Sequence, residues 1–422
     1  MGEGSLSSAM ATARRADAAN AGAVAGAAAK RVWVERLQLT DFRNYSALSL
    51  NVGPGPVVLT GANGTGKTNL LEAVSLLTSG QGLRRAPYPE LVRMGAAGWS
   101  VAARLETPFG RIDIGTGLAA APDADGRTEH GMGHSTGRNS GRVVRIDGET
   151  QSGPGVLADH VEMVWLIPAM DGLFTGPASD RRRFLDRLIV CLHPSYRSLL
   201  GQFERAMQQR NRLLMDDVRE GARFEAFERI MAEAGVAVAA ARASAVAELV
   251  AAIGTRRDAG VGALFPWAEL ALVGSLEAAL ATRPAVDIED DYCALLGRER
   301  ERDRAAGRAL EGPHRSDLAV GHGPKEMPAQ VCSTGEQKAL LIGLVLAHCD
   351  IVGQRREGAA PILLLDEITA HLDPLRRAAL FDEIVVLGTQ AWMSGTDPDA
   401  FVALAERAQF YRVEEGRIAP CR

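Results

Sequence analysis

An α/β fold interrupted by an inserted helical domain is predicted for this chain of 422 residues. Three observations predict it. A glycine-rich loop at 61–68 joins a short apolar run to a helical pattern, and an apolar run at 362–365 ends in two carboxylates. Between 179 and 296, apolar residues recur every three or four positions. Since β patterns lie on both sides of these helices, the flanking parts are expected to form one α/β domain.

Bulk properties limit the possible partners. With 46% hydrophobic residues the chain can bury a large core. The net charge of −5 gives no global attraction to nucleic acid, so such binding would depend on local basic patches. No run of about 18 apolar, uncharged residues is present, so no membrane span or membrane partner is predicted. Five scattered cysteines without CxxC pairs favour a reducing cytoplasm: Cys191, Cys293, Cys332, Cys349 and Cys421.

Four segments are predicted along the chain. Residues 1–30 are rich in Ala, Gly and Ser, and we expect either a disordered tail or a start codon that was assigned too early, before Met10. Residues 31–178 form the N-terminal part of the α/β domain, 179–300 a helical arm and 301–422 the C-terminal part. Within the first part, 119–141 is a polar, Gly-rich surface insertion, whose glycines argue against a helix aligning His130 and His134 on a metal.

The element order near the N-terminus leads to the first site. Alternation at 32–39 and a β pattern at 47–52 predict strands, 56–60 a buried strand, and 68–77 a helix. The loop between the last two matches G-x-x-x-x-G-K-[ST] in full, which is the phosphate-binding P-loop pattern. We expect its backbone amides and Lys67 to hold the phosphates of ATP and Thr68 to contact Mg²⁺. The predicted ATP-binding residues are Gly61, Ala62, Asn63, Gly64, Thr65, Gly66, Lys67 and Thr68.

Two acidic residues follow the apolar run at 362–365. A buried parallel strand delivers side chains at its C-terminal end, so Asp366 and Glu367 fit a Walker B pattern. Asp366 is predicted to hold Mg²⁺ with Thr68, and Glu367 to act as the catalytic base toward water, because a metal-bound carboxylate is not free for that task. The alternative to a Walker B motif is an ordinary strand end followed by an acidic turn.

A third motif precedes this strand. Cys332-Ser-Thr-Gly-Glu-Gln-Lys338 opens an apolar helical pattern, and Ser333 with Glu336 alone would form a capping box. Placed before a Walker B strand, and with His371-Leu372-Asp373 in the D-loop position, it resembles the signature motif of ABC-type ATPases. That resemblance implies an ABC-type ATPase head of the P-loop NTPase class that forms an ATP-dependent homodimer. Ser333 and Gly335 would contact the ATP held by the partner's P-loop.

The spacing of the motifs narrows the class. Ser333 lies 266 positions after Lys67, and helical sequence fills much of the gap. The helical subdomain of transporter ATPases is much shorter, whereas SMC-type coiled coils are far longer and have sustained heptads. A DNA-metabolism ATPase with a short arm is therefore favoured.

Several further segments resemble the RecF family of this class, from Val32 onward. They are Leu37-x-Leu39-x-x-Phe42-Arg43-Asn44-Tyr45, Arg182-Arg183-Phe184-Leu185-Asp186, Gln209-Arg210-Asn211 and Gly312-Pro313-His314-Arg315, besides the Walker B and D-loop. The resemblance implies slow, DNA-dependent ATP hydrolysis as a switch and binding to single-stranded, double-stranded and gapped or junction DNA. It also implies a role in replication, repair and the SOS response, with mediators RecO and RecR in recombinase loading. The alternatives are another short-armed SMC-like DNA ATPase or, in a different class, the ATPase subunit of a transporter.

The sequence departs from the family at three places. Glu336 stands where a second Gln is commoner, 367–370 read E-I-T-A, and the segment Val164–Asp171 lacks the expected Q-loop glutamine. Neither Glu336 nor the sequence at 367–370 removes a phosphate contact.

Three groups of polar residues fit two interpretations each, and a fourth fits one. Arg43 and Asn44 either approach the nucleotide or form a turn, and Arg181–Arg183 either contact DNA phosphates or pair with Asp180 and Asp186. His314 and Arg315 form either a structural corner or a phosphate contact. The segment Arg298–Arg308 alternates with acidic residues, which is typical of a solvated helix face.

Overall fold

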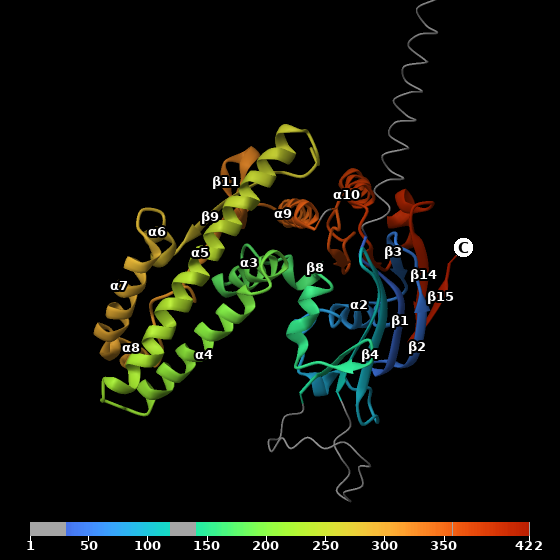
Figure 1. Cartoon of the computed structure of the whole chain (residues 1–422). Helices are drawn as coiled ribbons and strands as arrows, with labels where there is room; N and C mark the ends of the chain where they lie inside the picture. Colours follow the sequence, from blue (N-terminus) through green and yellow to red (C-terminus); the bar gives the residue numbers. More distant parts are fainter. Residues whose placement is uncertain (1–30, 119–140, 357, 422) are drawn as a thin grey trace, which may run out of the picture.

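The computed structural model describes residues 31–118, 141–356 and 358–421. The predictions for the tail at 1–30 and for His130 and His134 fall outside these residues. Figure 1 shows a head that contains most of the strands and an arm of long helices that extends from it. The predicted fold, an α/β domain whose two halves flank inserted helices, is confirmed.

The first sheet of the head is antiparallel and follows the N-terminal alternation. Along β1, Val34, Leu37 and Leu39 are buried, whereas Gln38 and Thr40 are exposed, and a register shift follows Val34. The sheet has the strand order β2-β1-β4-β5-β6-β7. Its strands are β1 (Trp33–Phe42), β2 (Tyr45–Asn51), β4 (Trp99–Thr107), β5 (Gly110–Leu118), β6 (Val143–Ile146) and β7 (Glu149–Thr150).

The second sheet of the head is parallel from β14 to β8, with β15 antiparallel at one edge. Every residue of β3, β13, β12 and β8 is buried, as expected of parallel strands covered on both faces. In sheet order the strands are β15 (Arg417–Pro420), β14 (Gln409–Glu414), β3 (Val57–Thr60), β13 (Ala391–Gly395), β12 (Ile362–Leu365) and β8 (Met163–Leu166). The C-terminal ends of β3, β12 and β13 therefore share one edge, where ligands bind in open α/β sheets.

Three helices surround this edge. The helix α2 (Lys67–Ser75) contacts both β1 and β13 and so lies between the two sheets. The helix α9 (Thr334–Arg355) packs against α10 (Pro374–Leu387) and against the arm. Short 3-10 helices complete the connections: η2 (Tyr88–Leu91), η3 (Pro154–Asp159), η4 (Pro168–Met170), η5 (Gly323–Lys325), η6 (Ala329–Val331) and η7 (Pro398–Leu404).

The segment predicted as an arm at 179–300 is mainly helical, and its helices run from Ala178 to Ala306. It consists of α3 (Ala178–Leu192), α4 (Tyr196–Met215), α5 (Ala222–Asp258), α6 (Ser275–Leu280), α7 (Ala285–Arg298) and α8 (Arg300–Ala306). It also contains β9 (Ala268–Val273), which pairs with β10 (Asp317–His322), itself paired with β11 (Met327–Pro328). The backbone of β10 needs a hydrogen-bonding neighbour, and β9 supplies it from within the segment predicted as helical.

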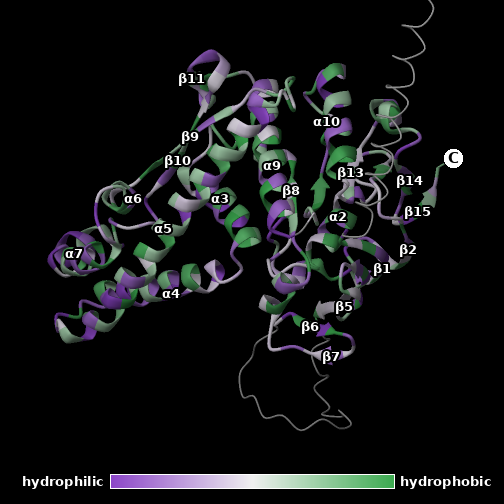
Figure 2. Cartoon of the chain, turned by 45° about the horizontal axis from the view of Figure 1, so that its top comes forward, coloured by the Kyte–Doolittle hydropathy of each residue, from purple (hydrophilic) through white to green (hydrophobic). Residues whose placement is uncertain are grey.

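The long helix α5 is the spine of the arm. By length and composition alone it could cross a membrane, but it packs on α4, α7 and α9 and carries Arg242, which is ion-paired with Asp186. Such a helix is typical of a protein core. The approach of its neighbours is close at Gly235, where an added Cβ would lie 3.1 Å from Tyr292 and 3.2 Å from Phe203. Figure 2 shows hydrophobic residues gathered in the head, whereas the helices of the arm carry both hydrophobic and hydrophilic residues.

The distal arm has its own small core and a buried ion-pair network. Arg210 pairs with Glu228 at 3.0 Å and with Asp303 at 2.6 Å, and all three side chains are at most 2% exposed. Glu228 also binds Arg300. The prediction of a wholly solvated face at Arg298–Arg308 is therefore wrong for Arg300 and Asp303, because these two residues neutralise buried partners on α4 and α5.

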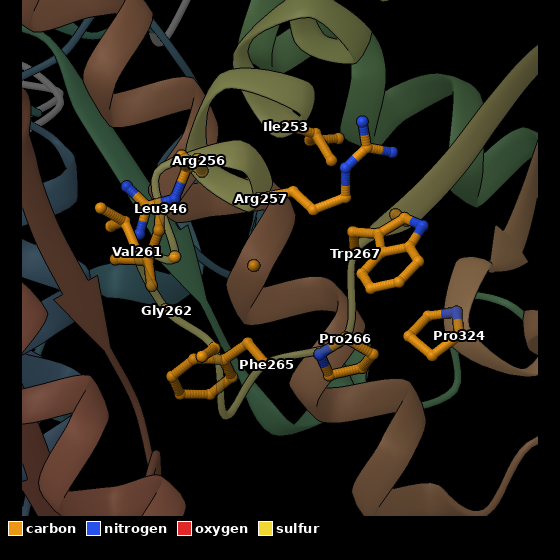
Figure 3. Close-up of a pocket in the computed structure, with 14 residues that line it drawn as sticks. Ile253, Arg256, Arg257, Val261, Gly262, Phe265, Pro266, Trp267, Pro324 and Leu346 are labelled. Atoms are coloured by element: carbon orange, nitrogen blue, oxygen red, sulfur yellow. The ribbon is translucent and has the colours of Figure 1, made fainter.

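A cavity of about 210 Å³ lies where the C-terminal end of α5 meets the segment 260–268 and α9. In Figure 3, Trp267, Pro266 and Phe265 line one side of it and Arg257 lies near Trp267. Arg256 also lines it and pairs with Asp350 of α9 and Glu383 of α10. The cavity thus marks a joint where one arginine ties the arm to two helices of the head.

Candidate nucleotide-binding site

The loop at 61–66 connects β3 to α2 at the shared edge of the parallel sheet. Gly61, Gly64 and Gly66 have φ values of 148°, 81° and 114°, which side-chain-bearing residues rarely adopt. At Gly61 an added Cβ would lie 2.4 Å from the backbone carbonyl oxygen of Val413, so no larger residue fits without moving the backbone. No side chain caps the start of α2 in the described chain. The first backbone amides of α2 are therefore available to an anion such as phosphate.

Lys67 is the cation of this loop. Its Nζ donates hydrogen bonds to the carbonyl oxygens of Gly61 and Ala62, both at 2.8 Å, and the residue is 5% exposed. Burial lowers the pKa of Lys67, while the charges of Glu367 and Asp366 act in the opposite direction. The side chain thus folds over the loop, where the β and γ phosphates of a nucleotide are bound in P-loop proteins.

Asp366 follows β12 and closes the site from the other side. Its Oδ1 accepts hydrogen bonds from Thr68 Oγ1 at 3.0 Å and from Ser394 Oγ at 2.6 Å. The structure therefore brings together the two residues predicted to hold a metal ion, although they are 298 positions apart. A carboxylate beside a hydroxyl is a set of hard oxygen donors that suits Mg²⁺.

Glu367, the predicted base, occupies a turn directly after Asp366. Its backbone has φ 48°, an uncommon value for a residue other than glycine, and such outliers cluster at functional sites. Ser394 Oγ accepts a hydrogen bond from Glu367 N at 2.9 Å, while Lys338 Nζ donates to the carbonyl oxygen of Glu367 at 3.3 Å. Two side chains therefore hold this turn and leave the carboxylate half-buried at the site.

Lys338 links the turn at Glu367 to the segment after β8. Its Nζ lies 3.5 Å from Asp171 Oδ2, and the residue is 3% exposed. Burial lowers the pKa of Lys338, and the negative charge of Asp171 opposes that effect. Asp171 belongs to the segment in which no Q-loop glutamine was found. A buried lysine of the signature helix α9 thus contacts both the Walker B turn and this segment.

Arg43 and Asn44 form the turn between β1 and β2, and the turn lies against the P-loop. Asn44 Nδ2 donates to Thr65 O at 3.0 Å, and Asn44 Oδ1 accepts from Asn69 Nδ2 at 2.8 Å. Arg43 donates from Nε and Nη2 to the Glu72 carboxylate at 2.9 and 3.1 Å. Asn44 therefore supports the loop, whereas the Arg43 guanidinium is paired on α2. Their contact with a nucleotide stays a prediction.

Ser333 and Gly335 lie at the exposed start of α9, and Ser333 is its N-cap. The capping box is present, with the Ser333 amide donating to Glu336 Oε2 at 3.0 Å. Glu336 also pairs with Lys325 at 2.5 Å. This ion pair, together with hydrogen bonds from Ser333, lowers the pKa of Glu336 to about 2. Among the described residues, no hydrogen bond joins 333–337 to the P-loop, so this helix start does not complete the site of its own chain.

The three consecutive arginines of α3 have different surroundings. Arg181 binds both oxygens of Asp317, at 2.8 and 2.7 Å, and Arg183 pairs with Asp180. Arg182 donates to Ser316 O and has no carboxylate partner in the described part of the chain. Pairing within the chain thus accounts for Arg181 and Arg183. His314 Nε2 lies 3.0 Å from Ala309 O and its ring packs beside Phe203, which is the structural-corner interpretation.

Three residues of the site were missed from the sequence: Ser394, Lys338 and Asp171. A signal existed for Ser394, because it lies near the end of a short apolar strand that follows the Walker B strand. Residues at the C-terminal ends of parallel strands line the ligand site, and this rule, which located Asp366, applies equally to Ser394. Lys338 and Asp171 had no such signal, since nothing in their local pattern shows that the two are neighbours.

The fold and this site define an ABC-type ATPase head with a helical arm. The family model described as RecF/RecN/SMC N terminal domain matches residues 33–411. Relatives described as DNA replication and repair protein RecF include one from Mesorhizobium japonicum, 51% identical over 92% of this chain and 97% of its own length. One from Rhizobium etli strain CFN 42 is 50% identical over 92% of this chain and 99% of its own. The chain belongs to the RecF family of DNA replication and repair proteins.

Solved structures agree on the fold. A structure described as the recombination mediator protein RecF-ATPrS in the RecFOR pathway has a TM-score of 0.77 at 20% identity, covering 93% of this chain and 99% of that one. A Pyrococcus furiosus Smc head domain has a TM-score of 0.51 at 16% identity, covering 92% and 96%. The relatives that are about 50% identical over 92% of the chain confirm the predicted RecF family, in preference to another short-armed ATPase or a transporter subunit.

Proposed function

We propose that this protein binds ATP with Mg²⁺ and hydrolyses it slowly, as a switch that closes two copies around DNA. The observation that carries the proposal is the meeting of Thr68, Asp366 and Glu367 beside an uncapped P-loop helix. Lys67 and the amides of α2 would bind the phosphates. The Glu367 carboxylate would accept a proton from the attacking water at its side-chain oxygen.

The oxygen donors of Thr68 and Asp366 would hold the metal ion. When bound there, Mg²⁺ neutralises charge on the phosphate oxygens. Ser394 donates to the same carboxylate oxygen of Asp366 as Thr68 does, and so fixes the orientation of the carboxylate. This second contact is of the kind that orients metal-binding groups in other proteins.

A second copy of the chain would complete the site. Ser333 is exposed and Gly335 is partly exposed at the start of α9, and their hydrogen bonds stay within the motif or α9. A helix N-terminus of this kind suits an anion, and the γ-phosphate on the partner's Lys67 has the required charge. ATP would then hold the dimer together and hydrolysis would release it.

The proposed ligand of the closed dimer is DNA with a gap or a single/double-strand junction. Support comes from the family, whose members are described as DNA replication and repair proteins, and from the structure described as part of the RecFOR pathway. On this proposal the protein acts in the cytoplasm, in repair and the SOS response, with RecO and RecR in recombinase loading. Recognition of backbone shape rather than bases is expected.

The test combines the ATPase rate and the oligomeric state, each measured with and without a gapped duplex. We expect monomers without nucleotide, dimers with ATP, and faster hydrolysis when the gapped duplex is present. An intact duplex of equal length and base composition serves as the matched ligand. A protein that stays monomeric at saturating ATP and gapped DNA would contradict the proposal. Hydrolysis that is insensitive to DNA would contradict the proposed coupling between DNA binding and the ATP switch.

A further inference from the structure

A cleft of about 890 Å³ lies between the head and the arm, away from the catalytic residues. Its walls are the segment 78–85 after α2, the region around β8, and the helices α3 and α4. None of the residues 61–68, 333–337 or 366–367 lines it. Eight arginines and four carboxylates do, although the whole chain has a net charge of −5. The cleft is thus a local positive region on an acidic protein.

Pairing within the cleft leaves most of these arginines without a counter-charge. Three have carboxylate partners: Arg84 with Glu72, Arg183 with Asp180 and Arg242 with Asp186. No carboxylate of the described residues lies within ion-pairing distance of the other five, which are Arg85, Arg182, Arg187, Arg197 and Arg205. Of the four carboxylates, Asp180 and Asp186 take part in these pairs and Glu162 is paired outside the cleft with Arg356, which leaves Glu204 as the one unpaired carboxylate among the described residues of the lining.

Arg187 shows how these cations are held. Its guanidinium lies 4.7 Å from the centre of the Trp165 ring and 5.5 Å from that of Phe184, and its Nε has no hydrogen-bond partner among the described residues. Burial lowers the pKa of Arg187 to about 10, and the nearby charge of Arg85 acts in the same direction. A buried cation without a counter-ion is destabilising, and a bound anion would relieve that cost.

We propose that this cleft binds consecutive phosphates of a single nucleic-acid strand. The inference rests on the proposed DNA-binding function and adds a site to it. A volume of about 890 Å³ is that of a small-ligand pocket, so it admits a short stretch of one strand and not a duplex. Guanidinium groups from several elements suit successive phosphates, which arginine binds through two parallel hydrogen bonds.

The site would communicate with the P-loop through α2. This helix begins at Lys67 and leads after Ser75 into the cleft wall at 78–85. Arg84 of that wall donates to Asn69 Oδ1 at 2.9 Å and contacts Glu72, which also pairs with Arg43. A nucleic-acid strand that fixes the segment 78–85 would therefore also affect α2, the helix whose first amides are proposed to bind the nucleotide.

Charge reversal tests the proposal at two exposed positions, Arg85→Glu with Arg205→Glu. Neither side chain has an ion-pair partner to lose, so the fold should be retained, and ATP affinity and thermal unfolding check this. The control is Arg145→Glu with Arg417→Glu, which makes the same change of charge on exposed residues of β6 and β15 that likewise have no ion-pair partner among the described residues. Affinity for a labelled 15-nucleotide oligo-dT is measured by anisotropy without ATP, over a series of salt concentrations.

We expect the cleft variant to bind oligo-dT at least tenfold more weakly and the control to bind within about twofold of the unmodified protein. Each lost phosphate contact should lower the slope of log affinity against log salt by about 0.7, so two contacts lower it by about 1.4. Equal affinity and slope for the cleft variant and the control would overturn the cleft proposal while leaving DNA binding intact. If the unmodified protein binds no DNA, with or without ATP, the proposed function itself fails.

Competition identifies the source of the phosphates. Inorganic tripolyphosphate at equal phosphate concentration should displace labelled oligo-dT less well than unlabelled oligo-dT does. Equal displacement would show that the cleft takes free polyphosphate and would overturn the assignment to a nucleic-acid strand. An acidic peptide that displaces the oligonucleotide better than unlabelled oligo-dT would overturn it in favour of a protein partner.

Discussion

Thr68 Oγ1 donates a hydrogen bond of 3.0 Å to Asp366 Oδ1 across 298 positions of sequence. The bond joins the first turn of α2 to the end of β12, so the P-loop helix and the Walker B strand are in direct contact. The inserted arm lies between these two residues in the sequence. Any movement of the arm that shifts β12 against α2 would therefore act on the metal-binding pair.

Ser394→Ala should impair hydrolysis more than nucleotide binding. The hydroxyl donates to Asp366 at 2.6 Å and accepts from the Glu367 amide at 2.9 Å, and it is fully buried. Its loss leaves both partners without this bond, at a cost of about 1–3 kcal/mol of stability. We expect a ten- to hundredfold lower hydrolysis rate, on the order of what misplaced catalytic groups cause. Ser394→Thr, which keeps the hydroxyl, is the control, and an equal loss in both variants would argue against the hydrogen bonds as the cause.

Glu367→Gln and Lys67→Ala should separate nucleotide binding from hydrolysis. Glutamine has the size of glutamate but cannot accept the proton, so hydrolysis should fall by about 10²–10⁴. ATP binding should persist, dimers should accumulate and DNA should be held longer. Lys67→Ala should lose all three properties, because the phosphates lose their cation. Binding of radiolabelled ATP, light scattering and DNA dissociation rates measure nucleotide binding, dimer formation and DNA retention, respectively. If Glu367→Gln hydrolyses ATP at the unmodified rate, Glu367 is not the base.

The fold followed from the sequence where one pattern covered a whole element. The runs at 57–60 and 362–365 are wholly buried strands, and the alternation at 33–42 is a half-buried one. The strand at 268–273 was missed, because its pairing with β10, more than forty positions away, cannot be read from the local pattern. The pair Arg300 and Asp303 was misjudged for a similar reason, since their neutralising partners lie on α4 and α5.

The candidate site could be predicted as far as its motifs reach. Lys67, Thr68 and Asp366 lie where the P-loop and Walker B patterns place them, because each pattern specifies a strand end and a loop. Supporting residues such as Lys338 meet their partners only in the folded chain. The nucleotide contacts of Ser333 and Gly335 stay predictions, because they depend on a second copy of the protein.

Lys325→Ala should weaken ATP-driven dimerisation, and Glu336→Gln should restore it in the same chain. Lys325 is the largest cause of the lowered pKa of Glu336, and it offsets a carboxylate at the helix start that is proposed to meet a phosphate. Without Lys325 the carboxylate repels that phosphate, and we expect a loss of about fivefold, as is typical of an exposed charge. Sedimentation with ATP at low and high salt measures it. The loss should shrink at high salt, where screening is stronger.

If the double variant dimerises no better than Lys325→Ala, charge at position 336 is not the cause. The control is Arg219→Ala, which removes an exposed cation paired with Asp217 and Glu301 at the far end of the arm. It should leave dimerisation unchanged.

His348 should make the protein sensitive to mild acid. It is fully buried on α9, with Nε2 2.9 Å from Leu188 O, and burial lowers its pKa from the ordinary 6.5 to about 4. The unfolded chain therefore takes up a proton below pH 6.5 that the folded chain refuses until about pH 4. The stability from neutral His348 is complete above pH 6.5 and is lost as the pH falls toward 4. At pH 5 this loss amounts to about 2 kcal/mol of unfolding free energy.

Urea unfolding at pH 7 and pH 5, compared with His348→Gln, isolates this contribution. Glutamine can still donate to Leu188 O but does not titrate, so the variant should lose about 2 kcal/mol less than the unmodified protein over this interval. All other titrating groups are common to both proteins and cancel in the comparison. Equal losses in the two proteins would mean that His348 is protonated in the folded state at pH 5. In that case, burial of His348 between α9 and α3 would not keep its side chain neutral.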